Sequence, residues 1–369
     1  MRALLFFPVI LLAMQSYAQQ TDYNLIIGTY TNTGKSEGIY VYNFNTNTAD
    51  FKAKSITKNV ENPSYLALGA GNKTIYAVNE TGASSAVSAF RFDAASGKLT
   101  FLNKQATGAD PCYVIADQKN VMTANYSGGS ISVFGIKKDG SLSALKLLAQ
   151  HTGKSIVKPQ QDQPHVHMAQ FTPDGKYIVV NDLGTDKIFL YKYNPNLNEK
   201  VLQTQYSIEV TPGTGPRHLV FSKDGKYAYL VGEINAGITV FSYSDGSLNE
   251  IQQTKLTEEG FNGQNGAADI HLSPDGKFLY ASNRGSENKI TIFAIEKGGL
   301  LSIRGYASTL GKGPRNFVID PSGKYLLVGH QYTNDVVIFE RNLETGALKD
   351  TGKRIEVGAP VCLVFAPVK

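Results

Sequence analysis

The sequence contains no tryptophan and only two cysteines, Cys112 and Cys362, among its 369 residues. Small domains that depend on disulfide bonds carry several paired cysteines, usually four, six or eight. Two cysteines exclude a framework of that kind. We expect Cys112 and Cys362 to remain two separate thiols.

Blocks of like charge are also missing. The formal net charge is +5, and no run of five or six lysines or arginines occurs in the chain. Proteins that bind nucleic acid concentrate their basic residues in a patch or along one element. The sequence therefore predicts no nucleic-acid partner.

Long apolar runs are limited to the N-terminus, and even that run is shorter than the ~20 residues of a membrane-spanning helix. Met1-Arg2 precedes an apolar stretch from Ala3 to Met14, and Gln15-Ser16-Tyr17-Ala18 follows. One positive charge, a short apolar stretch and a small-x-small ending are typical of a cleaved secretory signal peptide. We predict a signal peptide over residues 1–18 and a single domain over 19–369. The product would be secreted or periplasmic, without a membrane anchor.

Glycine and aromatic residues are plentiful, with 36 Gly, 20 Tyr and 18 Phe. Many of them belong to a repeated segment in which a turn carrying lysine separates two apolar strands. Asp-Gly between two apolar runs is a hairpin signal, because glycine adopts positive φ without steric cost. Clear copies of the turn are Asp174-Gly175-Lys176-Tyr177, Asp224-Gly225-Lys226-Tyr227, Asp275-Gly276-Lys277-Phe278 and Ser322-Gly323-Lys324-Tyr325, with weaker copies at Asn72-Lys73 and Gln118-Lys119.

The period of this repeat indicates the fold. Successive turn lysines are 46, 57, 50, 51 and 47 residues apart, and a third and a fourth strand follow each pair. Four strands at a period of about fifty residues are the signature of propeller blades. Six repeats leave strands at residues 23–51 and one strand at 360–368. We predict an all-β, seven-bladed β-propeller with four-stranded antiparallel blades, closed by N- and C-terminal strands in one blade.

The repeat also locates a pocket. Strands one and two of a blade are antiparallel, so the start of the first and the end of the second meet on one rim of the central channel. A position that only supports the fold would keep one residue type in every blade. Residues at the start of the first strand are Ser64, Cys112, His167, Arg217, Ala268 and Arg315, and those at the end of the second are Glu80, Tyr126, Leu183, Glu233, Arg284 and Gln331, preceded by Asn79, Asn125, Asp182, Gly232, Asn283 and His330. Their variety predicts a polar pocket on this rim.

At these residues the sequence resembles the propeller-type lactonases, which include bacterial 6-phosphogluconolactonase and the fungal 3-carboxymuconate lactonising enzyme. The matching stretches are Gln163-Pro-His-Val-His167, Gly215-Pro-Arg-His218, Val231-Gly-Glu-Ile-Asn235, Ala268-Asp-Ile-His271, Ser282-Asn-Arg284 and Gly313-Pro-Arg-Asn316. The resemblance implies a pocket of one His, two Arg and one Glu, carried here by Pro164 to His167, Arg217, Glu233 and Arg284. The export signal departs from the cytosolic setting of the phosphorylated lactone.

Opening a lactone requires an activated water, a stabilised oxyanion and a proton for the leaving alkoxide. We predict that Glu233 or His167 is the base and that Arg284 stabilises the charge. Arg217 would bind the acidic or polyhydroxy end of the substrate. The further substrate-binding residues we expect are His165, His218, Asn283, Arg315, His330 and Gln331. The expected ligand is a small sugar lactone or sugar acid, and no cofactor is expected.

Three alternatives stay open at this point. A divalent cation could be held by His165, His167, Asp182 and His330 on the same rim. The pocket could serve a cycloisomerase that closes lactones by proton transfer. The propeller could also be a non-catalytic platform for a ligand, because a fold alone does not decide function.

Overall fold

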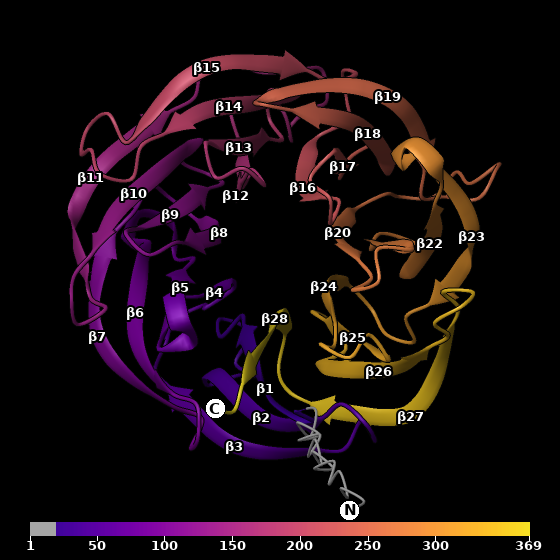
Figure 1. Cartoon of the computed structure of the whole chain (residues 1–369), viewed down its shortest axis with the longest axis horizontal. Helices are drawn as coiled ribbons and strands as arrows, with labels where there is room; N and C mark the ends of the chain where they lie inside the picture. Colours follow the sequence, from indigo (N-terminus) through magenta and orange to yellow (C-terminus); the bar gives the residue numbers. More distant parts are fainter. Residues whose placement is uncertain (1–19) are drawn as a thin grey trace, which may run out of the picture.

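A computed structural model describes residues 20–369, so the predicted signal peptide over 1–18 lies outside the described residues. Within the described part, twenty-eight strands form seven four-stranded antiparallel sheets around a central axis (Figure 1). We number these blades 1 to 7 in the order β4–β7, β8–β11, β12–β15, β16–β19, β20–β23, β24–β27 and β28 with β1–β3. The seven-bladed propeller predicted from the repeat is confirmed.

Each blade places its first strand at the channel and its fourth at the outer edge (Figure 1). The innermost strands are β4 (Leu66–Leu68), β8 (Pro111–Ala116), β12 (Val166–Phe171), β16 (Pro216–Phe221), β20 (Ala267–Leu272), β24 (Pro314–Ile319) and β28 (Pro360–Pro367). The second strands are β5 (Thr74–Asn79), β9 (Asn120–Asn125), β13 (Tyr177–Asp182), β17 (Tyr227–Gly232), β21 (Phe278–Asn283), β25 (Tyr325–His330) and β1 (Asp22–Thr29).

The third strands are β6 (Ala86–Asp93), β10 (Ser130–Ile136), β14 (Lys187–Tyr193), β18 (Gly237–Ser244), β22 (Lys289–Ile295), β26 (Asp335–Arg341) and β2 (Gly38–Asn45). The outer strands are β7 (Lys98–Ala106), β11 (Leu142–Gln150), β15 (Leu202–Glu209), β19 (Ser247–Lys255), β23 (Leu301–Ser308), β27 (Leu348–Glu356) and β3 (Phe51–Lys58). Three short 3-10 turns complete the described part, η1 (Ala70–Asn72), η2 (Gly82–Ser84) and η3 (Lys297–Gly299).

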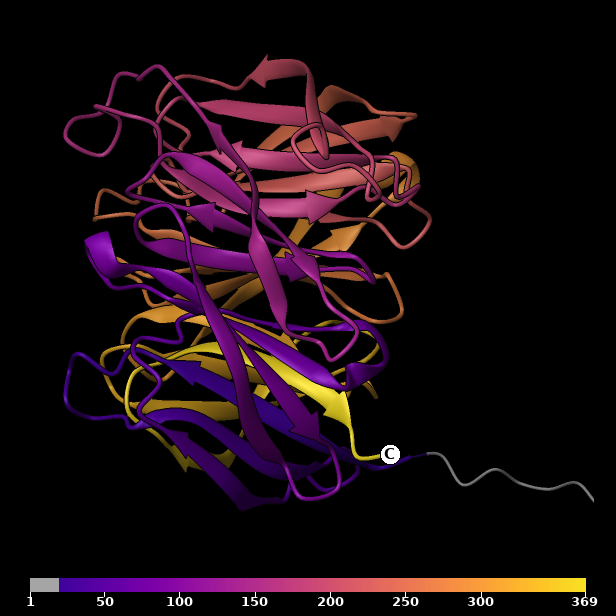
Figure 2. The same ribbon diagram turned by 90° about the vertical axis from the view of Figure 1, so that its left-hand side faces the viewer.

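Blade 7 closes the ring by joining the two ends of the chain. The C-terminal strand β28 pairs antiparallel with β1, with Ile27 opposite Leu363 and Leu25 opposite Phe365. In Figure 1 the yellow β28 lies beside the indigo β1, and Figure 2 shows the C-terminus emerging on one face of the propeller. This pairing gives blade 7 four strands like the other six blades and closes the ring.

The turns that carry lysine are stabilised by hydrogen bonds between an acidic side chain and other groups of the same turn. At the turn after β12, Asp174 Oδ1 accepts hydrogen bonds from the Thr172 hydroxyl at 2.7 Å and the Lys176 backbone N–H at 3.0 Å. Gly175 between them has φ of +67°, which a residue with a Cβ adopts only with strain. The Asp-Gly-Lys pattern therefore specifies the hairpin that the sequence predicted.

Apolar faces of neighbouring blades pack against one another and form the core. All six residues of β9 are buried, because this strand is covered by the blades on both sides. Most residues of the outer strand β19 are instead exposed or half-buried. Cys112 and Cys362 are both buried and free, as expected. No helix within residues 20–369 combines the length and apolarity needed to cross a bilayer.

A one-residue bulge near the start of the innermost strand changes the direction of the side chains at the channel. Opposite β13, Val166 pairs with Asp182 and Met168 with Asn181, so His167 is the extra residue. The same shift makes Cys112 extra opposite β9 and Arg315 extra opposite β25. Blades 4, 5 and 7 carry the shift at the equivalent place. Bulges re-aim side chains and break the strict alternation of a strand. Arg217 and His218 are consecutive, and both take part in the same network at the channel.

Candidate active site

Two sets of seven residues surround one mouth of the channel. The upper ring consists of the residues that follow the second strands: Tyr30, Glu80, Tyr126, Leu183, Glu233, Arg284 and Gln331. The lower ring consists of Ser64, Cys112, His167, Arg217, Ala268, Arg315 and Val361. In every blade of the described chain, the backbone N–H of the upper-ring residue donates to the carbonyl two residues before the lower-ring residue, at 2.8–3.3 Å. This shared bond holds the two rings in one register.

The centre of the site is a carboxylate shared by two arginines. Glu233 Oε2 accepts a hydrogen bond from Arg217 Nε at 2.7 Å and lies 3.0 Å from Arg284 Nη2. Arg217 is almost fully buried, whereas the Glu233 side chain is 27% exposed. Arg284 Nε also donates to the Gly266 carbonyl at 2.8 Å. Residues of two adjacent blades, 4 and 5, thus fix both guanidinium groups at the channel mouth.

The charges of these groups follow from their neighbours. Burial raises the pKa of Glu233, but Arg284 and Arg217 lower it more, and the net pKa lies below the ordinary glutamate value. Burial and the nearby Arg284 lower the pKa of Arg217 to about 10. At neutral pH the cluster therefore contains one carboxylate and two cations. The remaining positive charge is available to an anionic or polarised ligand atom.

His167 supplies an imidazole without a protein partner. Its side chain is buried, its Nδ1 has no hydrogen bond to residues 20–369, and no bond from Nε2 occurs there either. Burial and the cations Arg217, Arg315 and Arg284 hold the pKa of His167 well below its usual range. His167 is therefore neutral at physiological pH. Its ring meets Tyr126 edge-on, with centroids 5.6 Å apart. A neutral imidazole with free nitrogens can accept a proton from water.

A buried network beneath the rings orients Arg217. Asp269 Oδ1 accepts from His218 Nδ1 at 2.8 Å, so the His218 Nε2 lone pair faces Arg217 Nη1 at 3.2 Å. Asp269 Oδ2 accepts from Asn316 Nδ2 at 2.5 Å and bonds His271 Nε2 at 2.9 Å. Burial and Arg217 lower the pKa of His218 to about 4, which keeps it neutral. Arg217 Nη1 also donates to the Ala268 carbonyl. The position of Arg217 is thus set from below by His218 and from the side by Glu233.

Across the channel, a second carboxylate has a different environment. Glu80 Oε2 accepts from the Tyr30 hydroxyl at 2.8 Å and the Ser64 hydroxyl at 2.6 Å. The Arg315 guanidinium lies 5.4 Å from the centroid of the Tyr30 ring. Burial raises the pKa of Tyr30, so its hydroxyl stays protonated and donates. Sequence reasoning placed Glu80 and Ser64 on the rim but gave them no role, and it missed Tyr30 because blade 7 lacks the turn lysine.

The other residues predicted for the pocket take varied positions. His165 Nδ1 lies 3.0 Å from the Tyr126 carbonyl, and its ring stacks on Tyr126 at 4.3 Å between centroids. Asn283 bonds the Gly266 N–H and Glu287, and His330 Nδ1 lies 3.1 Å from Asp335. These last two precede upper-ring residues, and strand alternation turns them toward their own blades. The structure does not bring Asn283 and His330 together with the rings.

The residues of the metal alternative are also separated by their contacts. Asp182 Oδ2 bonds His151 Nδ1 at 2.8 Å, and its Oδ1 accepts from the backbone of His165, Gly184 and Thr185. His330 faces Asp335 in its own blade. Among residues 20–369, no group of three or more His, Cys, Asp or Glu side chains is placed to hold a metal ion.

Two hollows are lined by residues of this rim. The inner hollow has a volume of only about 10 Å³ and is lined by Ser64, Cys112, Arg217 and Arg315, among others. The outer hollow has a volume of about 580 Å³ and includes Tyr30, Glu80 and Gln331 in its lining. Ser64 of the inner hollow and Glu80 of the outer hollow are hydrogen-bonded to each other. The outer hollow has the size of a small-molecule site.

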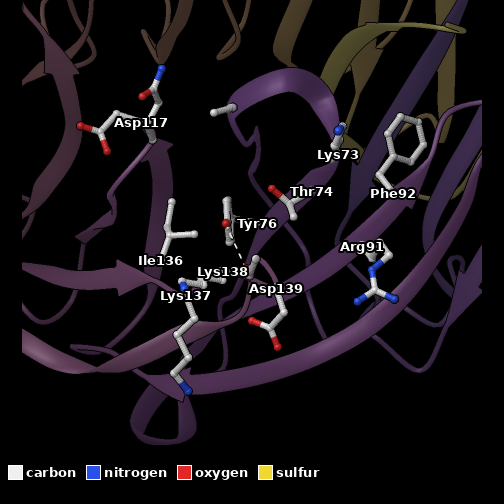
Figure 3. Close-up of a pocket in the computed structure, with 13 residues that line it drawn as sticks. Lys73, Thr74, Tyr76, Arg91, Phe92, Asp117, Ile136, Lys137, Lys138 and Asp139 are labelled. Carbon is white, nitrogen blue, oxygen red and sulfur yellow. Dashed lines mark hydrogen bonds between the residues drawn. The ribbon is translucent and has the colours of Figure 1, made fainter.

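A different hollow of about 700 Å³ lies between blades 1 and 2, on the face that carries the turn lysines (Figure 3). Lys73, Arg91, Lys137 and Lys138 line it, and all four are solvent-exposed. The Tyr76 hydroxyl at its base donates to the Gly140 carbonyl at 3.0 Å. This groove contains none of the ring residues, and exposed surface lysines alone do not make a reaction site.

Comparison with known proteins agrees with this geometry. The chain matches the family model "Lactonase, 7-bladed beta-propeller" over residues 24–365. The 6-phosphogluconolactonase of Bacillus subtilis is 37% identical over 351 residues, which cover 94% of this chain and 99% of that protein. The structure of a periplasmic gluconolactonase from Pseudomonas aeruginosa has a TM-score of 0.90 at 35% identity, and the match covers 95% of this chain and all of that one.

The crystal structure of a protein from Bacteroides fragilis resembles this chain more strongly, with 47% identity and a TM-score of 0.91. The match covers 94% of this chain and 98% of that one. All of these matches span nearly the whole propeller rather than one blade. The chain therefore belongs to the family of seven-bladed β-propeller lactonases and is 6-phosphogluconolactonase-like.

Proposed function

We propose that this protein hydrolyses a sugar lactone to the corresponding sugar acid at the mouth of its central channel. The observation that carries the proposal is the Arg217–Glu233–Arg284 cluster beside an unbonded, neutral His167. Cations fixed by a shared carboxylate suit the negative charge that develops on a lactone oxygen. A free imidazole suits activation of the attacking water.

The reaction proceeds in two steps. His167 takes a proton from water while the water oxygen bonds to the lactone carbonyl carbon, and the carbonyl oxygen becomes an oxyanion beside Arg284. The tetrahedral intermediate then collapses and breaks the ring C–O bond. The imidazolium returns its proton to the departing alkoxide, which leaves a hydroxy acid and neutral His167. Atoms and charge balance without a cofactor.

His167 is the better base of the two candidates. Glu233 is stabilised as a carboxylate by two arginines, so it has little tendency to accept a proton. Its role in this proposal is to hold the two guanidinium groups in place. Binding the substrate oxyanion near the same cations offsets the repulsion that disfavours imidazolium at His167. Proton transfer is therefore coupled to charge development on the substrate.

Hydrolysis is proposed rather than lactone closure because the matched family and the B. subtilis relative carry lactonase names. Export is part of the same proposal. The N-terminal pattern of charge, apolar run and small residues supports it, and so does the likeness to a periplasmic gluconolactonase. A sugar lactone outside the cytoplasm would be the substrate.

A pH-stat assay tests this function. Purified protein is mixed with glucono-δ-lactone, its 6-phosphate and several γ-lactones, and the acid released is titrated against buffer alone. We expect hydrolysis of at least one sugar lactone far above the buffer rate, and loss of that activity in His167→Ala. A matched control is Glu258→Gln, which alters an exposed carboxylate paired with Lys289. Hydrolysis no faster than buffer for every lactone would refute the proposal.

A further inference from the structure

The space available at the site restricts where a substrate can lie. The inner hollow, next to Arg217 and Arg315, has a volume of about 10 Å³, which is about the room of one water molecule. The outer hollow has a volume of about 580 Å³, and Glu80 in its lining is hydrogen-bonded to Ser64 in the lining of the inner hollow. The inner hollow has no room for the remaining atoms of a lactone whose reacting carbonyl lies at the arginines. The outer hollow is large enough for them and is lined by Tyr30, Glu80 and Gln331 of the upper ring.

Glu80 presents a free carboxylate oxygen to this outer hollow. Its Oε2 is held by the Tyr30 and Ser64 hydroxyls, which fix the side chain in place. Its Oε1 receives no hydrogen bond from the part of the chain that the structure describes. Neither does it form an ion pair there, in contrast to Glu233, which pairs with two arginines. An oriented carboxylate oxygen without a hydrogen-bond partner is a strong acceptor for a ligand donor.

A second carboxylate oxygen in the lining has the same character. Asp110 Oδ1 accepts from the Gly82 N–H at 2.6 Å, while its Oδ2 has no partner within residues 20–369. Gln331 Oε1 is buried and also lacks a partner in the described chain. None of the residues that line this hollow in the described structure is a Lys, Arg or His. The lining thus offers acceptors with two negative charges and contains no cation. Arg315, which interacts electrostatically with Glu80, lines the inner hollow instead.

The two carboxylates give the channel mouth a direction. Glu80 belongs to blade 1 and Glu233 to blade 4, so they face one another across the ring. The Glu233 side carries Arg217 and Arg284 and suits the carbonyl end of a lactone. The Glu80 side carries acceptors and suits hydroxyl groups, which donate. Arg315 approaches this side from the lower ring without lining the outer hollow.

We propose that the outer hollow is a subsite for the hydroxyl-bearing tail of the lactone, and that Glu80 selects a neutral polyhydroxy lactone over one phosphorylated on that tail. This inference rests on the proposed lactonase function and specifies its substrate class. Hydroxyl groups on the tail donate to Glu80 Oε1 and Asp110 Oδ2. A phosphate in the same place has only acceptor oxygens and faces two like charges, so it loses these bonds and is repelled.

The test compares kcat/KM for glucono-δ-lactone and its 6-phosphate. We expect the protein to favour the neutral lactone by at least about 10-fold, since hydrogen bonds to charged groups are worth about 10- to 100-fold in binding. Glu80→Gln keeps an acceptor for Tyr30 and Ser64 but removes the charge. We expect this variant to lower kcat/KM for the neutral lactone about 10-fold through KM. In this variant, the ratio of kcat/KM for the neutral lactone to kcat/KM for the phosphorylated lactone should fall by about 10-fold or more.

A second variant acts in the opposite sense and does not depend on Glu80. Gln331→Lys places a cation in the outer hollow, and we expect it to raise kcat/KM for the phosphorylated lactone. Glu258→Gln serves as the charge-matched control and should leave the preference unchanged. A folded Glu80→Gln protein with the wild-type preference, or a wild-type protein that favours the phosphate, would overturn the subsite.

Failure of the lactonase function is distinguishable from failure of the subsite. If the wild-type protein hydrolyses neither lactone, the proposed function is lost, and calorimetric binding of gluconate and 6-phosphogluconate measures the subsite directly. The subsite is supported if the wild-type protein binds gluconate more tightly than 6-phosphogluconate and this difference in affinity is smaller in Glu80→Gln. An equal preference in wild type and variant contradicts it.

Discussion

Replacement of Glu233 by Gln removes the charge that holds two arginines together while keeping the size of the side chain. Glu233 Oε2 bonds Arg217 at 2.7 Å and Arg284 at 3.0 Å, and Arg217 is almost fully buried. Removing one member of a buried ion pair costs about 3–5 kcal/mol. The Glu233 side chain is 27% exposed, so solvent screens part of this cost and about 2 kcal/mol is the expected loss.

For a chain of this length, a loss of about 2 kcal/mol corresponds to a decrease in Tm of roughly 3 °C. The effect on catalysis is larger, because both guanidinium groups lose the contact that aims them. We expect kcat/KM for a hydrolysed lactone to fall by about 100-fold or more. Thermal unfolding followed by circular dichroism and the pH-stat assay give the two values on one preparation.

The control for this experiment is Glu258→Gln, whose carboxylate is 56% exposed and pairs with Lys289 at the surface. Exposed pairs contribute about 0–1 kcal/mol, so neither Tm nor activity should change measurably. If Glu233→Gln retains the wild-type kcat/KM, the reasoning that Glu233 positions the catalytic arginines is refuted. An unchanged Tm would contradict the stability estimate separately.

Three further predictions concern pH and metal. The pKa of His167 lies well below 6.5 and that of Glu233 below 4.5, so both groups stay deprotonated as pH falls through 6.5. We expect kcat/KM, corrected for buffer hydrolysis, to remain level from pH 8 to 6.5 and to fall only at lower pH; an acid limb centred at pH 7 would contradict this. His218 has a pKa of about 4 in the folded protein against an ordinary 6.5. The unfolded chain therefore binds a proton that the folded chain does not, and stability should decline by up to about 3 kcal/mol as pH falls from 6.5 to 4. His218→Asn should make this decline in Tm shallower, and an equally steep decline would exclude His218 as the cause. Prolonged dialysis against a chelator should leave the lactonase rate unchanged, whereas loss of activity that added divalent cation restores would reinstate a metal role.

The architecture could be predicted because the repeated turns are specified by residues close together in the sequence. Each Asp-Gly-Lys turn specifies its own hairpin through contacts a few residues apart, such as those of Asp174 with Thr172 and Lys176. The spacing of the turns then gives the number of blades. Blade 7 followed by elimination, since strands at both ends of the chain lacked partners.

The site could be predicted only in part, because position on the rim does not reveal contacts between blades. The shared carboxylate of Glu233 depends on Arg217 from its own blade and Arg284 from the next one. Counting from the turns placed all three on one rim but did not show which pairs meet. The inner-strand bulge was visible only as a slip of one residue near Cys112.

Two causes explain most of the differences between the predicted and the observed site: the alternation of side chains along a strand, and the lack of a turn lysine in blade 7. Asn283 and His330 stand one residue before Arg284 and Gln331, and the pleat of the strand turns them toward partners in their own blades. Tyr30 was missed because blade 7 has no turn from which to count. Its bond to Glu80 joins residues fifty positions apart, and no local pattern encodes it.

The most direct test of the account is the rate of lactone hydrolysis by Arg284→Ala. This variant removes the guanidinium placed to stabilise the oxyanion while leaving Arg217, Glu233 and His167 in the chain. We predict a loss of about 100- to 1,000-fold in kcat for a protein that still shows the propeller's circular dichroism spectrum. A folded Arg284→Ala protein that opens the lactone at the wild-type rate would contradict the assignment of the reaction to this cluster.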